Sequence, residues 1–300
     1  MASDLFSLVS FRNKRLHRSF LSAGLEPKLL DIDNETTIHC WCPKKQDTHK
    51  PNVVLIHGFG TNAMWQWYPQ VEPFGKSFNV FVPDLMFFGE STTRGSGRSE
   101  VFQAESIMKM LKKFGVTKFS AIGTSYGGFV AYHLGCLYPE AVEKVVIASS
   151  GVCKNGKDNE ELLQRAGLQK VSELLLPQTA DNLRTLMRLS LYKPPSLLPN
   201  FVLNDYIKTL YVKNRAEKEE LLRGVILGTE LAPPLPVLKQ DVLIVWGEHD
   251  QIFPVEKALE LKKHLGDQAE LVVMKNASHV PHIENPQEFN KIVEKFLLQK

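Results

Sequence analysis

The sequence is poor in cysteine: its 300 residues include only four, at positions 40, 42, 136 and 153. None of them forms a C-x-x-C pair or a Cys/His spacing typical of metal sites, so we expect reduced thiols and no metal centre. No apolar run comes near the roughly 18 residues that a membrane-spanning helix needs. The N-terminus also lacks an apolar core followed by a small-residue cleavage site. These absences predict a soluble protein of the cytoplasm.

The sequence also lacks a long block of one charge. Its 36 Lys and Arg residues and 33 Asp and Glu residues are spread along the chain and leave a formal charge of +3. This distribution does not indicate a nucleic-acid partner. There is no repeat or low-complexity tract, and 43% of the residues are hydrophobic. Such a chain is long and apolar enough for one large α/β domain with an inserted subdomain.

Residues 1–24 form an N-terminal segment in which apolar side chains are followed by basic ones. These side chains are Leu5, Phe6, Leu8, Val9 and Phe11, then Arg12, Lys14, Arg15 and Arg18. The favoured interpretation is a solvated helix that packs on the edge of the sheet. A transient contact of residues 1–20 with a membrane surface is an alternative, because basic amphipathic helices bind lipid headgroups. A transit peptide is a third interpretation, since the segment is rich in arginine and poor in acid.

Short apolar runs and helical patterns alternate along most of the chain. We expect strands at 28–31, 37–41, 52–57, 78–82, 119–124, 142–149, 241–247 and 270–274, the first two as an antiparallel hairpin. Helices are expected at 98–114, after 125, at 254–265 and at 285–298. Continuous apolar strands separated by helices predict a parallel sheet that is covered on both faces.

The pattern changes between residues 152 and 236, where strand-like runs stop. Helical segments are expected around 160–176, 180–189, 199–211 and 216–227, separated by prolines and a glycine. Because this region lies between two strands of the sheet, we expect it to form a helical cap, or lid. Residues 25–151 and 237–300 then form the core. The apolar side chains of the cap either face the core or pack the cap on itself, and both readings stay open.

The central motif of the chain surrounds Ser125. Gly123 and Gly127 flank this serine in a G-x-S-x-G arrangement, after an apolar strand and before a helical pattern. In this context, a sharp strand-to-helix turn holds a serine side chain above the edge of a sheet. Glycine has no β-carbon, so neither flanking residue blocks the close approach of strand and helix. The motif therefore predicts that Ser125 is a nucleophile.

A serine nucleophile needs a base, and the base needs a group that orients it. Asp250 follows the apolar run at 241–247, and His279 follows the one at 270–274. Ser125, Asp250 and His279 each come directly after a predicted strand, in the order serine, acid, histidine. We therefore predict that His279 is the base and Asp250 the orienting acid.

Other acids and histidines compete for these roles. Glu248 is the nearest substitute for Asp250, and Asp84 is an acid in some variants of the arrangement, although here it is expected to hold a local turn. His282 lies farther from the strand end than His279 and is interpreted as structural. His57 and His249 are expected to orient backbone rather than transfer protons.

Five motifs together resemble the α/β-hydrolase superfamily over about residues 50–295. They are His57-Gly-Phe-Gly60, Asp84 through Gly89-Glu90-Ser91, Gly123-Thr-Ser-Tyr-Gly-Gly128, Trp246-Gly-Glu-His-Asp250 and Ser278-His279. The resemblance implies a mostly parallel eight-stranded sheet with helices on both faces, an inserted helical cap and no cofactor. It also implies that the N–H groups of Phe59 and Tyr126 form an oxyanion hole.

Within this superfamily, the sequence is similar to enzymes of the monoacylglycerol lipase and esterase type. It is also similar to hydrolases that cleave carbon–carbon bonds in aromatic ring-opening products. Met86-Phe87 replaces the usual Pro-Gly, and Ser278 replaces the usual glycine before the histidine, which leaves the choice of substrate open. Ser125 excludes the nucleophilic aspartate of similar epoxide hydrolases and dehalogenases.

The first functional hypothesis is an ester hydrolase that acts on a small apolar ester. Candidates to line its apolar acyl pocket are leucines of the cap and seven other residues: Phe59, Met64, Trp65, Trp67, Phe87, Phe88 and Tyr126. Helix packing is an equally good reading of Trp65 and Trp67.

Two alternative functions follow from the same resemblance. The first is a small-molecule receptor that keeps the triad but turns over slowly or not at all. The second is carbon–carbon bond hydrolysis, for which Arg184, Arg188 and Lys193 could bind substrate carboxylates, although a solvated cap face is the favoured reading of these three residues.

Overall fold

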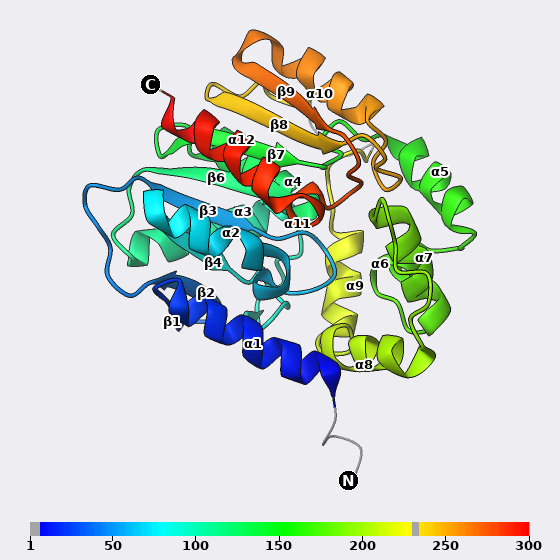
Figure 1. The fold of residues 1–300 in the computed structure, drawn as a ribbon. Coiled ribbons are helices and arrows are strands. Elements are labelled where there is room, and N and C mark those ends of the chain that lie inside the picture. The colour runs from blue at the N-terminus through cyan, green and yellow to red at the C-terminus, as the bar shows by residue number, and fades with distance from the viewer. Residues whose placement is uncertain (1–6, 230–233, 300) are drawn as a thin grey trace.

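The computed structural model describes residues 7–229 and 234–299 (Figure 1). Within these residues, one sheet has the strand order β1-β2-β4-β3-β6-β7-β8-β9. The strands are β1 (Leu25–Asp31), β2 (Thr36–Pro43), β3 (Asn52–Ile56), β4 (Asn79–Pro83), β6 (Phe119–Thr124), β7 (Val142–Ala148), β8 (Asp241–Gly247) and β9 (Ala269–Met274). Strand β2 runs antiparallel to β1 and β4, and the strands from β4 to β9 are parallel. The expected mostly parallel sheet is confirmed, with a two-residue strand β5 (Thr92–Thr93) added beside β2.

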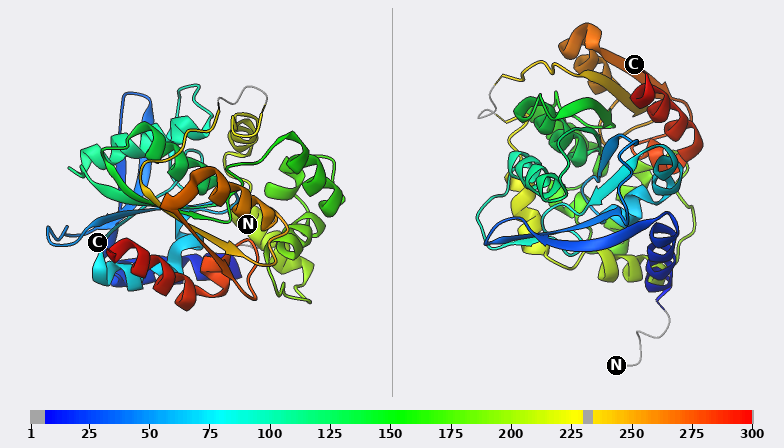
Figure 2. Two further views of the ribbon diagram at one scale, coloured as in Figure 1. Left: turned by 90° about the horizontal axis from the view of Figure 1, so that it is seen from above. Right: turned by 90° about the vertical axis from the view of Figure 1, so that its left-hand side faces the viewer.

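Helices cover both faces of this sheet (Figure 2). On one face lie α1 (Leu8–Ser22), α2 (Ala63–Ser77), α11 (Pro281–Glu284) and α12 (Pro286–Leu298), and on the other lie α3 (Glu100–Lys113), α4 (Tyr126–Leu137) and α10 (Glu256–Leu265). Each face has its own apolar cluster, one built on α2 and α12 and the other on α3, α4 and α10. All six residues of β6 are buried, as expected for a strand that is covered on both faces.

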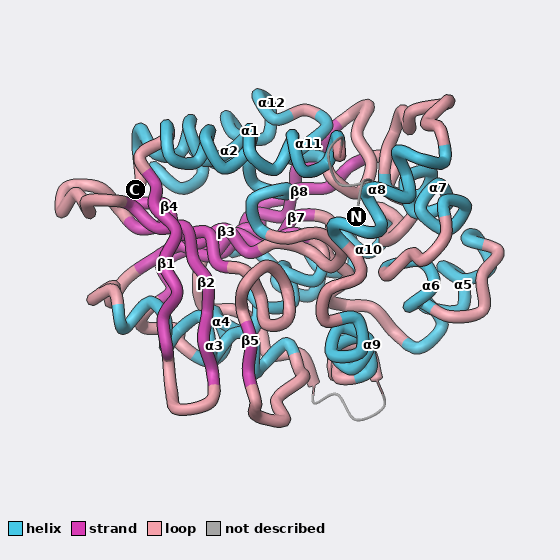
Figure 3. The backbone as a smooth tube through the Cα atoms, turned by 90° about the horizontal axis from the view of Figure 1, so that it is seen from below, coloured by secondary structure: helices cyan, strands magenta, loops and turns pink. Residues whose placement is uncertain are grey.

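In its described residues, the region between β7 and β8, which we call the cap, forms five helices on one side of the strands (Figure 3). These are α5 (Gly156–Ala166), α6 (Val171–Leu175), α7 (Ala180–Ser190), α8 (Asn200–Leu210) and α9 (Arg215–Arg223). The single helix expected at 160–176 is wrong, because Gly167 ends α5 with a φ of 67° and α6 starts separately. Residues 230–233 of the expected cap lie outside the described residues.

The apolar side chains of the cap take both of the roles that were left open. One cluster, around Leu183, Leu203 and Ile207, packs the cap helices on one another. A second cluster joins Leu162 and Leu189 of the cap to Ile252 of the core. The cap is therefore packed directly on the loop that follows β8.

Helix α1 packs on α2 and also reaches the cap. The Asp205 carboxylate on α8 accepts hydrogen bonds from the Ser7 hydroxyl, at 3.0 Å, and from the Val9 N–H, at 3.1 Å. Leu8 and Phe11 remain exposed. Residues 1–6 of the expected N-terminal segment lie outside the described residues, and membrane contact by this segment stays a prediction.

The structure can be compared with the expectations on membrane-spanning helices and on the cysteines. None of the helices in the described part of the chain combines the length and apolarity needed to cross a membrane. All four cysteines are free thiols, and burial raises the pKa of each of them.

Candidate active site

Ser125 lies at the turn between β6 and α4 in a strained backbone conformation. Its φ of 52° and ψ of −121° are unusual for a residue with a side chain, and such strain is typical of functional turns. Hydrogen bonds on both sides hold the turn. The Ser125 N–H donates to the Ala148 carbonyl at 2.9 Å, and the Ser125 carbonyl accepts from the Ser150 hydroxyl at 2.6 Å.

The two glycines of the G-x-S-x-G motif are required by close backbone contacts. A β-carbon at Gly123 would lie 2.0 Å from the Gly127 carbonyl oxygen, and one at Gly127 would lie 2.2 Å from the Ile56 carbonyl oxygen. Neither contact can be relieved by moving a flexible side chain. The motif therefore reflects how tightly α4 packs against β6 and β3, which is what lifts Ser125 above the sheet.

His279 and Asp250 meet Ser125 above the carboxyl ends of the strands. His279 Nε2 lies 2.9 Å from Ser125 Oγ, and His279 Nδ1 lies 2.9 Å from Asp250 Oδ2. The other oxygen of Asp250 accepts the N–H groups of Ile252, at 2.8 Å, and Phe253, at 3.0 Å. A carboxylate can only accept from Nδ1–H, so the Nε2 lone pair is left to accept the serine proton. This is the arrangement that a general base requires.

The loops that carry the acid and the histidine are held together by backbone contacts. A β-carbon at Gly247 would lie 2.0 Å from the Ser278 carbonyl oxygen, so the loops after β8 and β9 touch. The Ser278 N–H donates to Glu284 at 2.7 Å, and the Ser278 hydroxyl donates to the His249 carbonyl at 3.0 Å. Ser278, which replaces the usual glycine, thus contributes to the position of the histidine loop.

The loop after β3 passes directly beside the nucleophile. A β-carbon at Gly58 would lie 3.0 Å from the Ser125 β-carbon. Gln66 on α2 holds this glycine from both sides, because its Oε1 accepts the Gly58 N–H at 2.7 Å and its Nε2 donates to the Gly58 carbonyl at 3.0 Å. The Phe59 ring packs edge-on against Tyr126. Sequence reasoning missed Gln66, because α2 also contains Gln70, Glu72 and Lys76 and no motif distinguishes Gln66 from them.

His57 and Asp84 are fully engaged away from the three residues. The buried His57 ring accepts the Leu85 N–H at Nε2, 2.9 Å away, and contacts the Gly58 carbonyl through Nδ1 at 2.8 Å. Burial lowers its pKa. Asp84 accepts the Ala63 N–H at 2.8 Å and pairs with His39 at 2.8 Å. Both residues hold backbone, as the sequence suggested.

Glu248 and His249, by contrast, are half exposed. The His249 ring stacks on Tyr192 with 4.6 Å between the ring centroids, and the side chains of Glu248 and His249 lie 3.6 Å apart. It is Asp250, and not Glu248, that contacts His279.

His282 is fully buried between the rings of Trp67 and Phe289. Neither of its ring nitrogens has a hydrogen-bond partner among the described residues, and burial lowers its pKa to about 3. Its pKa in the unfolded chain is about 6.5, so the unfolded state binds the proton more tightly. The stability that His282 contributes is therefore complete above pH 6.5 and is lost as the pH falls toward 3.

We expect His282→Leu to reduce the acid sensitivity of the fold. The free energy of unfolding is measured in urea at pH 7 and at about pH 4.5. Its decrease between these two pH values should be about 2 kcal/mol smaller in the variant than in the wild type. His264→Leu, on α10, is the control. Equal losses in the wild type and His282→Leu would contradict a neutral, buried His282.

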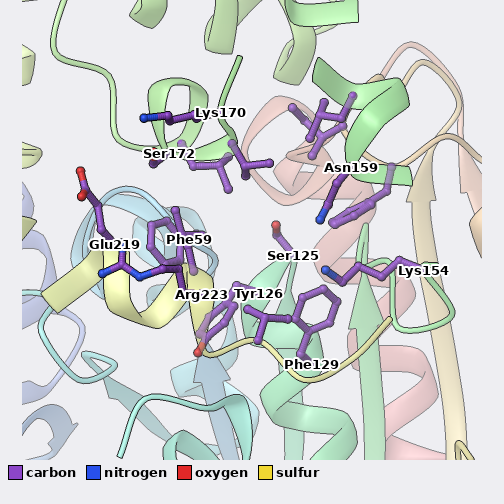
Figure 4. Close-up of a pocket in the computed structure, with 17 residues that line it drawn as sticks. Phe59, Ser125, Tyr126, Phe129, Lys154, Asn159, Lys170, Ser172, Glu219 and Arg223 are labelled. Carbon is purple, nitrogen blue, oxygen red and sulfur yellow. The ribbon is translucent and has the colours of Figure 1, made fainter. Parts of the chain in front are cut away.

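Ser125 lines two cavities, and a third cavity adjoins the second of them. The first, of about 440 Å³, lies between Ser125 and helices α5, α6 and α9 (Figure 4). The second, of about 150 Å³, is lined by Ser125 and His279. The third, of about 560 Å³ and mostly apolar, lies between α1, α7 and α8. The second and third cavities share seven lining residues: Thr61, Gln66, Leu186, Ser190, Tyr211, Val280 and Ile283.

The candidate acyl-pocket residues differ in how close they lie to Ser125. Phe59 and Tyr126 line the first cavity. Trp65 lines the third cavity, and Phe87 and Phe88 line a separate small cavity next to α8 and α9. Met64 and Trp67 pack in the apolar cluster built on α2.

The three cations considered for carboxylate binding are on the cap surface. Arg184 contacts Asp181 at 3.0 Å, and Arg188 donates to the Arg165 carbonyl at 3.2 Å. Lys193 lies over the Tyr192 ring. They line neither of the two cavities at Ser125, nor the third cavity. Among the described residues, no group of three or more His, Cys, Asp or Glu side chains is arranged to hold a metal ion.

Comparisons with known proteins identify the family of this fold. Residues 51–286 match a family model described as alpha/beta hydrolase fold. Monoacylglycerol lipase ABHD6 of Mus musculus is 26% identical over 277 residues, which cover 86% of this chain and 79% of that protein.

A second relative is named for a different substrate. The 2-hydroxy-6-oxononadienedioate/2-hydroxy-6-oxononatrienedioate hydrolase of a Pseudomonas species is 25% identical over 252 residues, covering 82% of this chain and 87% of the relative. Among solved structures, the 2-hydroxy-6-oxo-6-phenylhexa-2,4-dienoate hydrolase of Rhodococcus sp. strain RHA1 superposes with a TM-score of 0.77 and 24% identity. The superposition covers 92% of this chain and 99% of the Rhodococcus chain. At 24% identity, this similarity shows a shared fold and nothing about the substrate.

Proposed function

Because the chain belongs to the α/β-hydrolase family, we propose that it is a serine hydrolase that cleaves carboxylic esters with an apolar acyl group. The observation that carries this proposal is the pair of 2.9 Å contacts that join His279 to Ser125 and to Asp250. Three residues from distant parts of the chain meet in the order and geometry that acyl transfer needs. We assign Ser125 as the nucleophile, His279 as the base and Asp250 as the orienting acid.

The reaction proceeds through an acyl-enzyme. His279 Nε2 takes the proton from Ser125 Oγ as this oxygen attacks the ester carbonyl. The negative charge that develops on the carbonyl oxygen is stabilised by the N–H groups of Phe59 and Tyr126. His279 then gives its proton to the departing alcohol, which leaves the acyl group on Ser125. A water molecule, deprotonated by His279, attacks this acyl group and releases the acid as Ser125 regains its proton.

The cavities support an apolar acyl group. The small cavity beside Ser125 and His279 adjoins the mostly apolar cavity between α7, α8 and α1, because seven residues line both of them. An acyl chain attached to Ser125 can extend into this space and leave water. The similarity to a monoacylglycerol lipase points the same way.

We expect Leu186→Trp to shorten the acyl chains that the enzyme accepts. Leu186 lines both the cavity at Ser125 and the distal apolar cavity, so a larger side chain closes the passage between them. Each methylene kept out of an apolar site costs about 0.8 kcal/mol. The ratio of kcat/KM for decanoate to that for acetate should therefore fall by about 100-fold or more.

The measurement is a panel of p-nitrophenyl and glycerol esters of graded chain length, assayed with the wild type and with Leu186→Trp. Leu197→Trp, on the exposed cap surface, is the control and should keep the wild-type profile. If the wild type hydrolyses none of these esters but is stabilised by binding them, the proposal is wrong and a receptor role is favoured.

A second candidate is carbon–carbon bond hydrolysis. The relative named for a dienedioate substrate and the lysines in the first cavity favour it. This candidate predicts that vinylogous diketo acids are hydrolysed with a higher kcat/KM than any ester of the panel.

A further inference from the structure

The first cavity, between Ser125 and the cap, carries more positive than negative charge. Lys154, Lys170 and Arg223 line it, and Glu219 is the one carboxylate among the described lining residues. Glu219 already pairs with Arg215, which lies outside the cavity, at 3.2 Å. The cations are therefore not balanced by groups of the cavity itself. The distal cavity is mostly apolar, and Arg12 is the one charged residue among its described lining residues.

Lys154 is the cation nearest to the core, six residues after the end of β7. Its side chain is largely buried, and in Figure 4 its ammonium group points into the cavity toward Ser125. The ammonium lies 5.9 Å from the centre of the Phe129 ring. In the part of the chain that the structure describes, it has no hydrogen bond or ion pair. Burial lowers its pKa, because removing an ammonium group from water disfavours the charged form.

Two carboxylates are close enough to act on Lys154 electrostatically, but both have other partners. Glu100 accepts the backbone N–H groups of Ile226, at 3.0 Å, and Leu227, at 2.8 Å. Asp158 pairs with Lys257 at 3.1 Å. Neither carboxylate forms a hydrogen bond or ion pair with the Lys154 ammonium among the described residues, so an anion that enters the cavity would provide its first direct partner.

We propose that this cavity is an anion-binding subsite, and that the substrate is an ester whose alcohol half carries a phosphate or carboxylate group bound by Lys154. Lys170 and Arg223 add positive charge at the same cavity. This inference rests on the proposed ester hydrolysis and names its substrate class. The apolar acyl group occupies the distal cavity, and the anionic alcohol half occupies the cavity of about 440 Å³. The substrate is thus an amphiphile that spans Ser125.

Charge explains why an anion suits this cavity better than a neutral polar group. A buried ammonium group without a partner is costly, and a hydrogen bond between two charged groups recovers that cost. A neutral alcohol such as glycerol would leave Lys154 unpaired. An anionic group on the alcohol half therefore strengthens binding of both the substrate and the transition state. We expect this to raise kcat/KM for the anionic ester above that for the neutral ester.

The test compares matched esters with the same acyl chain. The probes are 1-decanoyl glycerol, 1-decanoyl glycerol 3-phosphate and the decanoyl ester of 3-hydroxypropanoate, all below their critical micelle concentrations. We expect the wild type to have a kcat/KM about 10-fold or more higher for one of the two anionic esters than for the neutral one. The phosphate and carboxylate arms identify which anion fits.

Variants of Lys154 make the test specific. Lys154→Met should lower the ratio of anionic to neutral kcat/KM by about 10- to 100-fold, and Lys154→Arg, which keeps the charge, should retain most of it. Lys157→Met, on the exposed start of α5, is the matched control and should keep the wild-type ratio. High salt should reduce the wild-type ratio.

A wild type that prefers the neutral ester, or an unchanged ratio in Lys154→Met, would overturn the inference and leave ester hydrolysis standing. Failure of the proposed function is recognised separately, because then none of the three esters is hydrolysed. In that case the subsite is still tested through binding. Thermal stabilisation of Ser125→Ala by 1-decanoyl glycerol 3-phosphate should be lost when Lys154→Met is added, and stabilisation that persists would overturn the inference.

Discussion

Replacing Ser125 by alanine is expected to lower kcat by about 10⁴- to 10⁶-fold while the protein stays folded. The substitution removes the oxygen that attacks the carbonyl and lies 2.9 Å from His279 Nε2. Alanine adopts the same backbone conformation as serine, so the turn held by Ala148 and Ser150 is kept. The measurement is kcat for the best ester of the panel, together with labelling by a fluorophosphonate probe. The wild type should be labelled and the variant should not.

Ser120→Ala is the matched control, because Ser120 lies on β6, the strand that leads into the nucleophile turn, five residues before Ser125. It should keep wild-type kcat and labelling. Equal labelling of the wild type and Ser125→Ala would show that another residue is the nucleophile, and the proposed reaction would then be wrong. Rapid labelling with slow turnover of every ester would instead favour the receptor hypothesis.

The meeting of the three residues could be predicted from sequence because of how parallel sheets are built. The carboxyl ends of parallel strands lie at one edge, so side chains that directly follow β6, β8 and β9 are brought to the same place. The argument needs only the strand ends, and these are marked by apolar runs. Local chain geometry thus carried most of the information about Ser125, Asp250 and His279.

The walls of the site could not be predicted in the same way. Helix α2 contains Pro69 and Pro73. Because proline in a helix interior removes a hydrogen bond, the local pattern does not indicate one continuous helix there. Without α2, the position of Gln66 next to Gly58 could not be inferred. Packing of α2 between the sheet, α1 and α12 outweighs the local cost of the two prolines.

The cap shows a second limit, because its helices are arranged by contacts between distant segments. Its helical periodicity identifies buried faces but does not say which core residue each face covers. Ile252 is covered by Leu162 and Leu189, and no local pattern indicates this pairing. For the same reason, Arg184 was considered for substrate binding although it lies on the cap surface, and Lys154 was not considered at all.

Asp250→Asn is expected to lower kcat by about 10⁴-fold, the second largest effect that we predict. The reason lies in the two backbone N–H groups, of Ile252 and Phe253, that donate to Asp250 Oδ1. In the variant, the amide oxygen must take this position, so the NH₂ group faces His279. An NH₂ donor requires Nδ1 to be the acceptor, which moves the ring proton to Nε2. His279 then presents a donor to Ser125 and cannot take its proton.

This prediction distinguishes orientation from simple loss of charge. Glu248→Gln removes a negative charge two residues away, on a half-exposed side chain that does not contact His279, and its kcat should stay within about twofold of the wild type because exposed charges are well screened. The measurement is kcat for both variants, with folding checked by thermal denaturation. If Glu248→Gln loses activity and Asp250→Asn keeps it, the acid is Glu248 and the loop after β8 rearranges in the active enzyme. A large loss confined to Asp250→Asn supports a mechanism in which the carboxylate sets the tautomer of His279.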